Sequence, residues 1–219
     1  MMKKTIAILL SLVMILGLAA CGNSASQTEQ PSTEDTSVES KADTESAENG
    51  TDMENTDNQD VQNHKALVAY FSATGTTKGV AEHIANGLNA DIYEIVPEEP
   101  YTDADLDYND NNSRTTIEMN DPDARPAISG SVENMEQYDI VFIGFPIWWY
   151  VAPTIINTFL ESYDFSGKTI VPFATSGGSG MGSTNEKLAP SCPGAILMKG
   201  KMLNGLLSQE ELKAWVKSL

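Results

Sequence analysis

Cysteine, histidine and basic residues are all scarce in this sequence. The 219 residues include two cysteines and two histidines, and 31 acidic residues outnumber 13 basic ones. Cys21 lies at the end of an N-terminal apolar run, so Cys192 has no second cysteine in the rest of the chain for a disulfide. No pair of histidines or cysteines has metal-ligand spacing, and we predict no metal site. The lack of clustered Lys and Arg disfavours nucleic acid as a partner.

No apolar run is long enough to cross a bilayer comfortably as a mature helix. The longest, Ile6–Leu18, follows a short basic start and is typical of a secretory signal. It leads into Leu18-Ala19-Ala20-Cys21, which resembles the lipobox of bacterial lipoproteins. We therefore predict a signal peptide over residues 1–20, lipidation of Cys21, and a protein held by lipid at the outer side of the bacterial cell membrane. The alternative is an ordinary signal peptide followed by a chance cysteine.

Residues 22–63 contain no aromatic residue and few apolar ones. They carry 11 acidic residues against one basic residue, Lys41. Such a segment buries too little surface to offset the entropy lost on ordering. We predict a lipidated cysteine and a disordered acidic tether over 21–63 and one globular domain over 64–219. This domain has 20 acidic and 10 basic residues, so it is acidic by itself.

Apolar strands alternate with amphipathic helices over residues 64–219. Strands are predicted at 66–71, 91–96, 139–144, 169–174 and 195–198, and helices at 77–88, from 153, from 183 and from 208. Ser183 and Glu186 have the spacing of a capping box. The acidic stretch 98–137 has weak signals, with one helix near 113–119 and either a lid or a plain irregular connection around it. The alternation predicts a doubly wound α/β sheet with its ligand at the carboxyl ends of the strands.

The first of these strands ends in a loop of small and hydroxylated residues. The candidate ligands are Ser72, Ala73, Thr74, Gly75, Thr76 and Thr77. A helix follows at once, and backbone amides at a helix N-terminus attract an anion. The loop has no lysine and is therefore not a P-loop, so a single terminal phosphate fits better than a nucleoside triphosphate. The alternative is a serine- and threonine-rich turn without a ligand.

Two further loops follow the third and fourth strands. The first has two adjacent tryptophans among Pro146, Ile147, Trp148, Trp149 and Tyr150, and it suits a flat, apolar ring that also needs backbone amides. The second is rich in glycine and supplies Thr175, Ser176, Gly177, Gly178 and Ser179. Its backbone can approach a planar ligand closely. Without a ligand, the first loop is a hydrophobic anchor and the second a flexible hinge.

The motifs SATGTT, PIWWYVAP and FATSGGSG together resemble the flavodoxin superfamily, in particular bacterial flavodoxin-like proteins with a Pro-Ile-Trp-Trp second loop. The resemblance covers residues 65–219. It implies three layers around a five-stranded parallel sheet of order 2-1-3-4-5, and a tightly held, non-covalent FMN. The hydroxylated loop would hold the phosphate, residues 146–150 would line the ring, and residues 175–179 would close its other edge.

The second loop departs from short flavodoxins, which keep a glycine beside the flavin where 146–150 has none. Entry into a positive-φ conformation costs more without glycine, which disfavours a one-electron shuttle. The first hypothesis is a membrane-tethered flavin protein that passes electrons to a redox partner protein or a quinone. The second is an NAD(P)H- or quinone-dependent FMN oxidoreductase. The third is a non-catalytic lipoprotein that binds another small ligand. No side chain is predicted to be catalytic, and the oligomeric state stays open.

Overall fold

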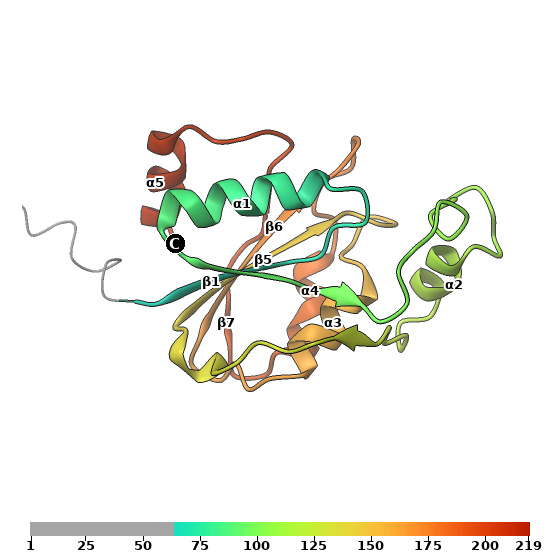
Figure 1. Cartoon of the computed structure of the whole chain (residues 1–219), viewed down its shortest axis with the longest axis horizontal. Helices are drawn as coiled ribbons and strands as arrows, with labels where there is room; N and C mark the ends of the chain where they lie inside the picture. Colours follow the sequence, from blue (N-terminus) through green and yellow to red (C-terminus); the bar gives the residue numbers. More distant parts are fainter. Residues whose placement is uncertain (1–63) are drawn as a thin grey trace, which may run out of the picture. The chain divides into compact units, whose positions relative to one another are not determined.

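The central sheet is parallel and has the order β2-β1-β5-β6-β7 (Figure 1). The computed structural model describes residues 64–219, so the predicted signal peptide, Cys21 and tether lie outside the described residues. The strands are β1 (Ala66–Tyr70), β2 (Asp91–Glu94), β5 (Ile140–Pro146), β6 (Thr169–Thr175) and β7 (Ile196–Leu197). The predicted doubly wound α/β sheet of order 2-1-3-4-5 is confirmed.

The fifth strand position is occupied by two short strands in succession. β7 pairs with the start of β6, and β8 (Lys201–Met202) pairs with Phe173 and Ala174 near its end. Residues 198–200 interrupt them, so the predicted strand at 195–198 is shorter than expected and is continued after the interruption.

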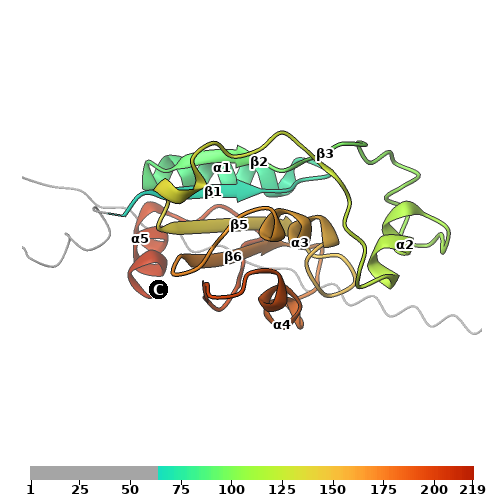
Figure 2. The ribbon, with the colours of Figure 1, turned by 90° about the horizontal axis from the view of Figure 1, so that it is seen from below.

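Two helices cover each face of the sheet, because successive strand residues point to opposite sides. Val68 and Phe142 face α1 (Thr76–Leu88) and α5 (Gln209–Lys217). Leu67 and Val141, one residue earlier in each strand, face α3 (Thr154–Glu161) and α4 (Thr184–Leu188). Figures 1 and 2 show these helix layers on either side of the strands. The buried apolar side chains form one core on each face, which holds the strand ends in place.

The last helix begins as its sequence predicts, whereas α4 does not. The Ser208 hydroxyl accepts from the amide of Glu211, whose carboxylate accepts from the amide of Ser208. Ser183 precedes α4 at φ −94° and ψ 25° and makes no capping bond, so the predicted capping box is wrong. An N-cap side chain reaches the first turn from an extended backbone, which Ser183 does not have.

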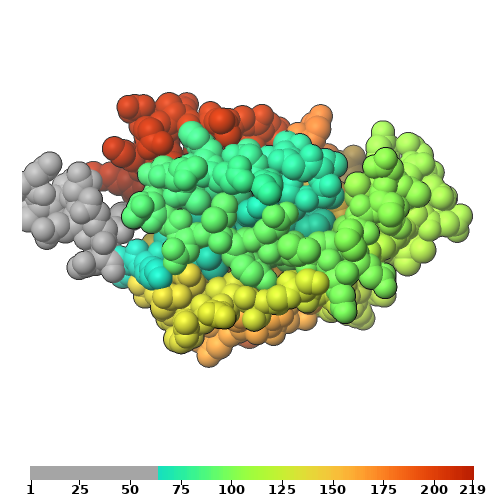
Figure 3. Space-filling model, in the orientation of Figure 1, coloured from blue at the N-terminus to red at the C-terminus, as the bar shows by residue number. Residues whose placement is uncertain are grey.

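The acidic stretch forms an excursion from the sheet, defined here as residues 98–127. The short strands β3 (Val96–Pro97) and β4 (Ile128–Ser129) pair antiparallel at its base. Within it, α2 (Arg114–Asn120) confirms the predicted helix, and the 3₁₀ turn η1 (Met135–Gln137) follows β4. Figure 3 shows the excursion standing out at one end of the domain. Among residues 64–219, no helix combines the length and apolar character needed to cross a membrane.

Candidate functional site

Three loops leave the sheet at the carboxyl ends of neighbouring strands. Tyr70 of β1 pairs with Gly144 of β5, and Pro146 of β5 pairs with Thr175 of β6. The loops that follow these strands are therefore side by side, at the end of the sheet where the excursion lies (Figures 1 and 2). This is the edge at which doubly wound sheets bind ligands.

The loop after β1 has the features that an anion requires. Gly75 stands at the N-cap of α1 with φ 86°, and no side chain caps the first turn. No acidic residue lies in that turn, so its amides and the positive end of the helix dipole face the loop. The hydroxyl oxygen of Ser72 is buried and has no hydrogen-bond partner. Because buried hydroxyls normally have a partner, this orphan fits a phosphate oxygen in the loop.

Thr175 joins the three loops to one another. Its hydroxyl shares a 2.9 Å hydrogen bond with the hydroxyl of Thr77, and both side chains are buried. Its carbonyl oxygen accepts from the amide of Ile147 at 2.8 Å. These bonds position the start of α1 and the aromatic loop against the end of β6. The predicted contacts of Thr77 and Thr175 with a cofactor stay predictions.

The loop after β5 is a tight aromatic hairpin, defined here as residues 148–151. Trp148 and Val151 exchange two backbone hydrogen bonds of 3.0 Å. The two residues between them, Trp149 and Tyr150, have φ values of 46° and 68°. Such values suit a two-residue turn, but they are strained for residues other than glycine. The sequence lacked the glycine that would relieve this strain, and the chain adopts the conformation nonetheless.

The four aromatic side chains around this hairpin differ in exposure. Trp148 packs edge-on against Phe71, with ring centroids 5.5 Å apart. Trp149 is 37% exposed and Tyr150 is 70% exposed, so both are open to a ligand or to solvent. Of the two adjacent tryptophans, only Trp148 packs against the core.

The glycine-rich loop after β6 is ordered by two polar residues. The hydroxyl of Ser176 accepts from the amides of Gly178 (3.2 Å) and Ser179 (2.8 Å). The amide of Ser176 donates to the side-chain oxygen of Asn204 at 2.8 Å. The loop is thus a folded turn, and the exposed Gly177 and Gly178 have open space where a side chain would stand.

Tyr101 of the excursion belongs to the same cluster and was missed by reasoning from the sequence. Its ring lies 5.3 Å from the ring of Trp148 and 5.7 Å from that of Phe71, in both cases edge-on. Its hydroxyl donates to Glu118 at 2.6 Å, and burial together with this carboxylate raises the pKa of the phenol. An aromatic residue at the start of an otherwise acidic stretch was the available signal. The excursion is therefore anchored to the site.

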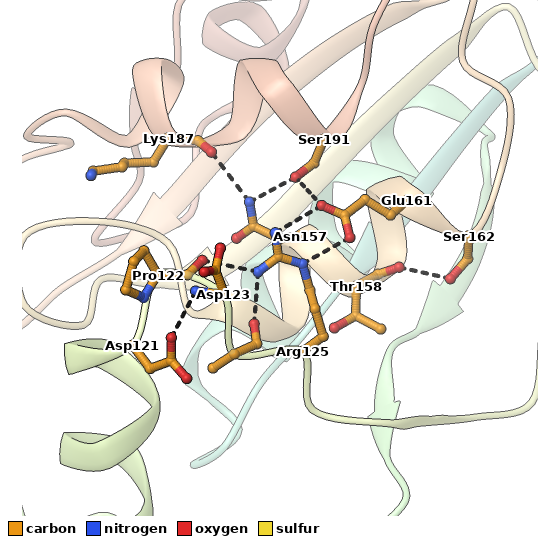
Figure 4. A network of polar contacts seen from close by, with 11 residues as sticks. Asp121, Pro122, Asp123, Arg125, Asn157, Thr158, Glu161, Ser162, Lys187 and Ser191 are labelled. Atoms are coloured by element: carbon orange, nitrogen blue, oxygen red, sulfur yellow. Dashed lines mark hydrogen bonds and ion pairs between the residues drawn. The ribbon is translucent and has the colours of Figure 1, made fainter.

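The two arginines of the excursion, Arg114 and Arg125, are both held by side chains of this chain. Arg114 donates to Glu118 at 2.7 Å and stacks on the ring of Tyr101 at 4.1 Å. Arg125 makes two hydrogen bonds to Glu161, of 2.8 and 2.9 Å, and Figure 4 shows this pair within a wider polar network. Both arginines act in the packing of the excursion.

The loop after β1 has no unpaired basic side chain beside it that could balance the charge of an anion. Lys78 of α1 lies 3.6 Å from the carboxylate of Glu94, which also accepts from Tyr70 at 3.0 Å. Burial, with this carboxylate, raises the pKa of the Tyr70 phenol. An anion bound here would depend on backbone amides and side-chain hydroxyls for its recognition. Within residues 64–219, no group of three or more His, Cys, Asp or Glu is placed to bind a metal ion.

The sheet and its three loops define a doubly wound α/β protein. At one edge of the sheet it carries a hydroxylated turn before an uncapped helix N-terminus and, beside it, an aromatic turn. The sequence comparison agrees with this class. The family model described as flavodoxin matches residues 65–219, and the chain belongs to the flavodoxin family.

Similar solved structures include two from Bacteroides. A candidate flavoprotein from Bacteroides eggerthii is 50% identical, with a TM-score of 0.68, over 71% of this chain and 97% of that one. A candidate flavoprotein from Bacteroides uniformis is 49% identical, with a TM-score of 0.66, over 70% and 98%. A Lactobacillus acidophilus flavoprotein in complex with FMN is 23% identical, with a TM-score of 0.55, over 70% and 99%, and shows the fold alone. No curated protein matches the chain.

Proposed function

We propose that this domain binds FMN non-covalently at the carboxyl edge of its sheet and transfers electrons through it. The observation that carries the proposal is the buried, unpartnered hydroxyl of Ser72 beside the uncapped N-terminus of α1. A phosphate there would accept from both. Membership of the flavodoxin family and the FMN complex of the Lactobacillus flavoprotein support the same ligand.

Each loop of the site has a distinct task in this proposal. The β1–α1 loop would hold the phosphate through the hydroxyls and amides of residues 72–77. The aromatic hairpin and residues 175–179 would hold the ring, because the hairpin exposes two aromatic rings and the glycine-rich loop has open space at Gly177 and Gly178. FMN, when bound, supplies reversible transfer of one or two electrons. The protein supplies position, exclusion of water and the acidic surroundings.

The decisive experiment is a titration of apoprotein with FMN and, separately, with riboflavin. We expect FMN to bind with its fluorescence quenched, and riboflavin to bind more weakly because it lacks the phosphate. The purified protein should also be yellow. An apoprotein that takes up neither flavin would exclude the proposal.

A second candidate is an oxidoreductase that uses NAD(P)H or a quinone with the same FMN. The observation that favours it is the glycine-free turn at Trp149 and Tyr150, which is already in a positive-φ conformation. Such a turn has less freedom to rearrange when electrons arrive one at a time. Steady-state turnover with NADPH and a quinone distinguishes the two, since an electron carrier alone shows almost none.

We further propose that the mature protein is anchored by lipid on Cys21 at the outer side of the bacterial cell membrane. The support is the Leu18-Ala19-Ala20-Cys21 sequence after a basic start and an apolar run. The acidic segment after it would let the domain reach a redox partner in the envelope. Mass spectrometry of the mature N-terminus should find a diacylated or triacylated cysteine. A Cys21→Ser variant should lose this mass and leave the membrane fraction.

A further inference from the structure

The loop after β6 touches the aromatic hairpin at Gly182. This residue has φ +51°, and a Cβ built on it would lie 2.0 Å from the carbonyl oxygen of Tyr150 and 3.1 Å from its carbonyl carbon. The first of these distances is too short for any real side chain. Position 182 therefore requires glycine for two reasons, its left-handed backbone and its close approach to Tyr150.

A single loop thus contacts the chain just before the hairpin and again at its turn. Thr175, at the start of this loop, accepts from the amide of Ile147, and Gly182, near its end, lies against Tyr150. Trp148 and Trp149 lie between these two contacts, and Trp149 and Tyr150 both have positive φ. A strained turn persists only where its surroundings determine it. The contact at Gly182 is one of the constraints that keep the turn in this form.

We infer that Gly182 is a positioning residue for the flavin ring. This inference rests on the FMN site proposed above. The loops after β5 and β6 bind the ring as one unit, and Gly182 sets the distance between the two loops at Tyr150. It acts through Tyr150 and touches no part of the ligand. It lies outside residues 175–179, which are the part of this loop that the sequence assigned to the ring.

Alanine at position 182 would force the Tyr150 carbonyl and the residue to separate by about 1 Å. The displaced turn would carry Trp149 and Tyr150 away from the ring. Gly180, in the same loop, provides the matched control, because its backbone is not left-handed and a Cβ there has nothing within 4 Å. Both glycines are exposed, so neither change alters the core.

The experiment titrates FMN and riboflavin into apoprotein with the full chain carrying Gly182→Ala or Gly180→Ala. Riboflavin keeps the ring and lacks the phosphate, so a change in ring positioning should weaken both ligands by the same factor. We expect Gly182→Ala to weaken each about tenfold or more, and Gly180→Ala to change each by less than about twofold. The melting temperature of each apoprotein, measured in parallel, should stay close to that of the wild type.

A third variant separates the contact from the backbone angle. Asparagine enters the left-handed region more readily than alanine but brings the same Cβ, so Gly182→Asn should weaken both ligands as Gly182→Ala does. Wild-type riboflavin affinity in Gly182→Ala, or its recovery in Gly182→Asn, would overturn the inference while leaving the FMN site in place. Loss of FMN affinity alone would also overturn it. A wild-type protein that binds neither flavin would overturn the proposed function as well.

Discussion

At the scale of single residues, Ser72 offers the sharpest test of the phosphate site. Its hydroxyl oxygen is buried without a partner, so removing it from the apoprotein removes an unpaired polar group. We predict that Ser72→Ala leaves the apoprotein as stable as the wild type or slightly more stable. The same change should lower the affinity for FMN by about tenfold or more, since a hydrogen bond to a charged group is worth roughly 1.5–3 kcal/mol.

Riboflavin provides the control for this prediction, because it has no phosphate to lose. Its affinity for Ser72→Ala should equal that for the wild type, as measured by quenching of flavin fluorescence. Thr74 is exposed in the same loop, and its hydroxyl lies 3.4 Å from that of Thr76. Thr74→Ala therefore measures how FMN affinity responds to the loss of a hydroxyl that already has a partner, for comparison with Ser72→Ala. Equal loss of both flavins in Ser72→Ala would place its hydroxyl away from the phosphate.

The sequence was enough to locate the residues at this edge of the sheet, but not to tell which of their side chains have hydrogen-bond partners. A hydroxylated loop before a helix is a local pattern, so Ser72 and Gly75 were visible in the sequence. Which hydroxyl is satisfied depends on a residue 98 positions away, since Thr77 is bonded to Thr175. Ser183 does not cap α4 because its backbone is not extended. The residue before it, Gly182, has a positive φ and lies against Tyr150, and no local spacing reveals that contact.

At the scale of elements, Tyr101 connects the excursion to the aromatic hairpin through ring contacts with Trp148 and Phe71. We predict that Tyr101→Ala frees the excursion without unfolding the sheet, because the strands keep their own cores. Hydrogen exchange should become faster at the amides of α2 and stay unchanged in β5 and β6. Tyr108→Ala is the control in the same excursion, since Tyr108 is 74% exposed. Equal exchange in α2 for both variants would show that Tyr101 is not the anchor.

A second anchor of the excursion is the ion pair between Arg125 and Glu161. Arg125, and to a lesser extent Ser191, holds the pKa of the Glu161 carboxyl below its usual 4.5. A lowered pKa in the folded state stabilises the protein above pH 4.5, and this gain is lost as the pH falls through the lower value. Because both side chains are partly exposed, the pair is worth at most about 1 kcal/mol.

We therefore predict that Arg125→Gln is less stable than the wild type near pH 7 and that the difference narrows below pH 4.5. Urea unfolding at intervals between pH 7 and pH 3 would measure it. Glu161→Gln removes the titrating group and should show the same convergence with the wild type. A difference that stays constant over this whole range would mean that Arg125 acts through packing and not through the charge of Glu161.

Elements with strong periodicity were predictable, and the arrangement of the excursion was not. The apolar strands and the helices after them follow from local patterns, and the parallel sheet follows from their alternation. The excursion has few apolar residues, so its path depends on pairs distant in sequence, such as Arg125 with Glu161 and Tyr101 with Trp148. The helix near 113–119 was predictable because Ser113 caps it locally, accepting from the amide of Thr116 at 3.3 Å.

At the scale of the whole molecule, every described strand and helix lies within residues 66–217, and the family match covers 65–219. The domain has a separate core on each face of its sheet, and the candidate site uses loops from three strands of that sheet. A ligand held by all three loops would therefore stabilise the domain as one unit. Binding to the folded state alone raises the unfolding free energy by mass action.

We predict that FMN raises the melting temperature of the full chain and of a chain of residues 64–219 by the same amount. At a free concentration 100 times its dissociation constant, FMN should add about 2.7 kcal/mol, or about 5–10 °C for a domain of this size. Inorganic phosphate, which engages only the β1–α1 loop, should give a much smaller shift at equal concentration. Scanning calorimetry of the two chains with each ligand would measure this. A shift confined to the full chain would mean that residues before 64 contribute to the flavin site.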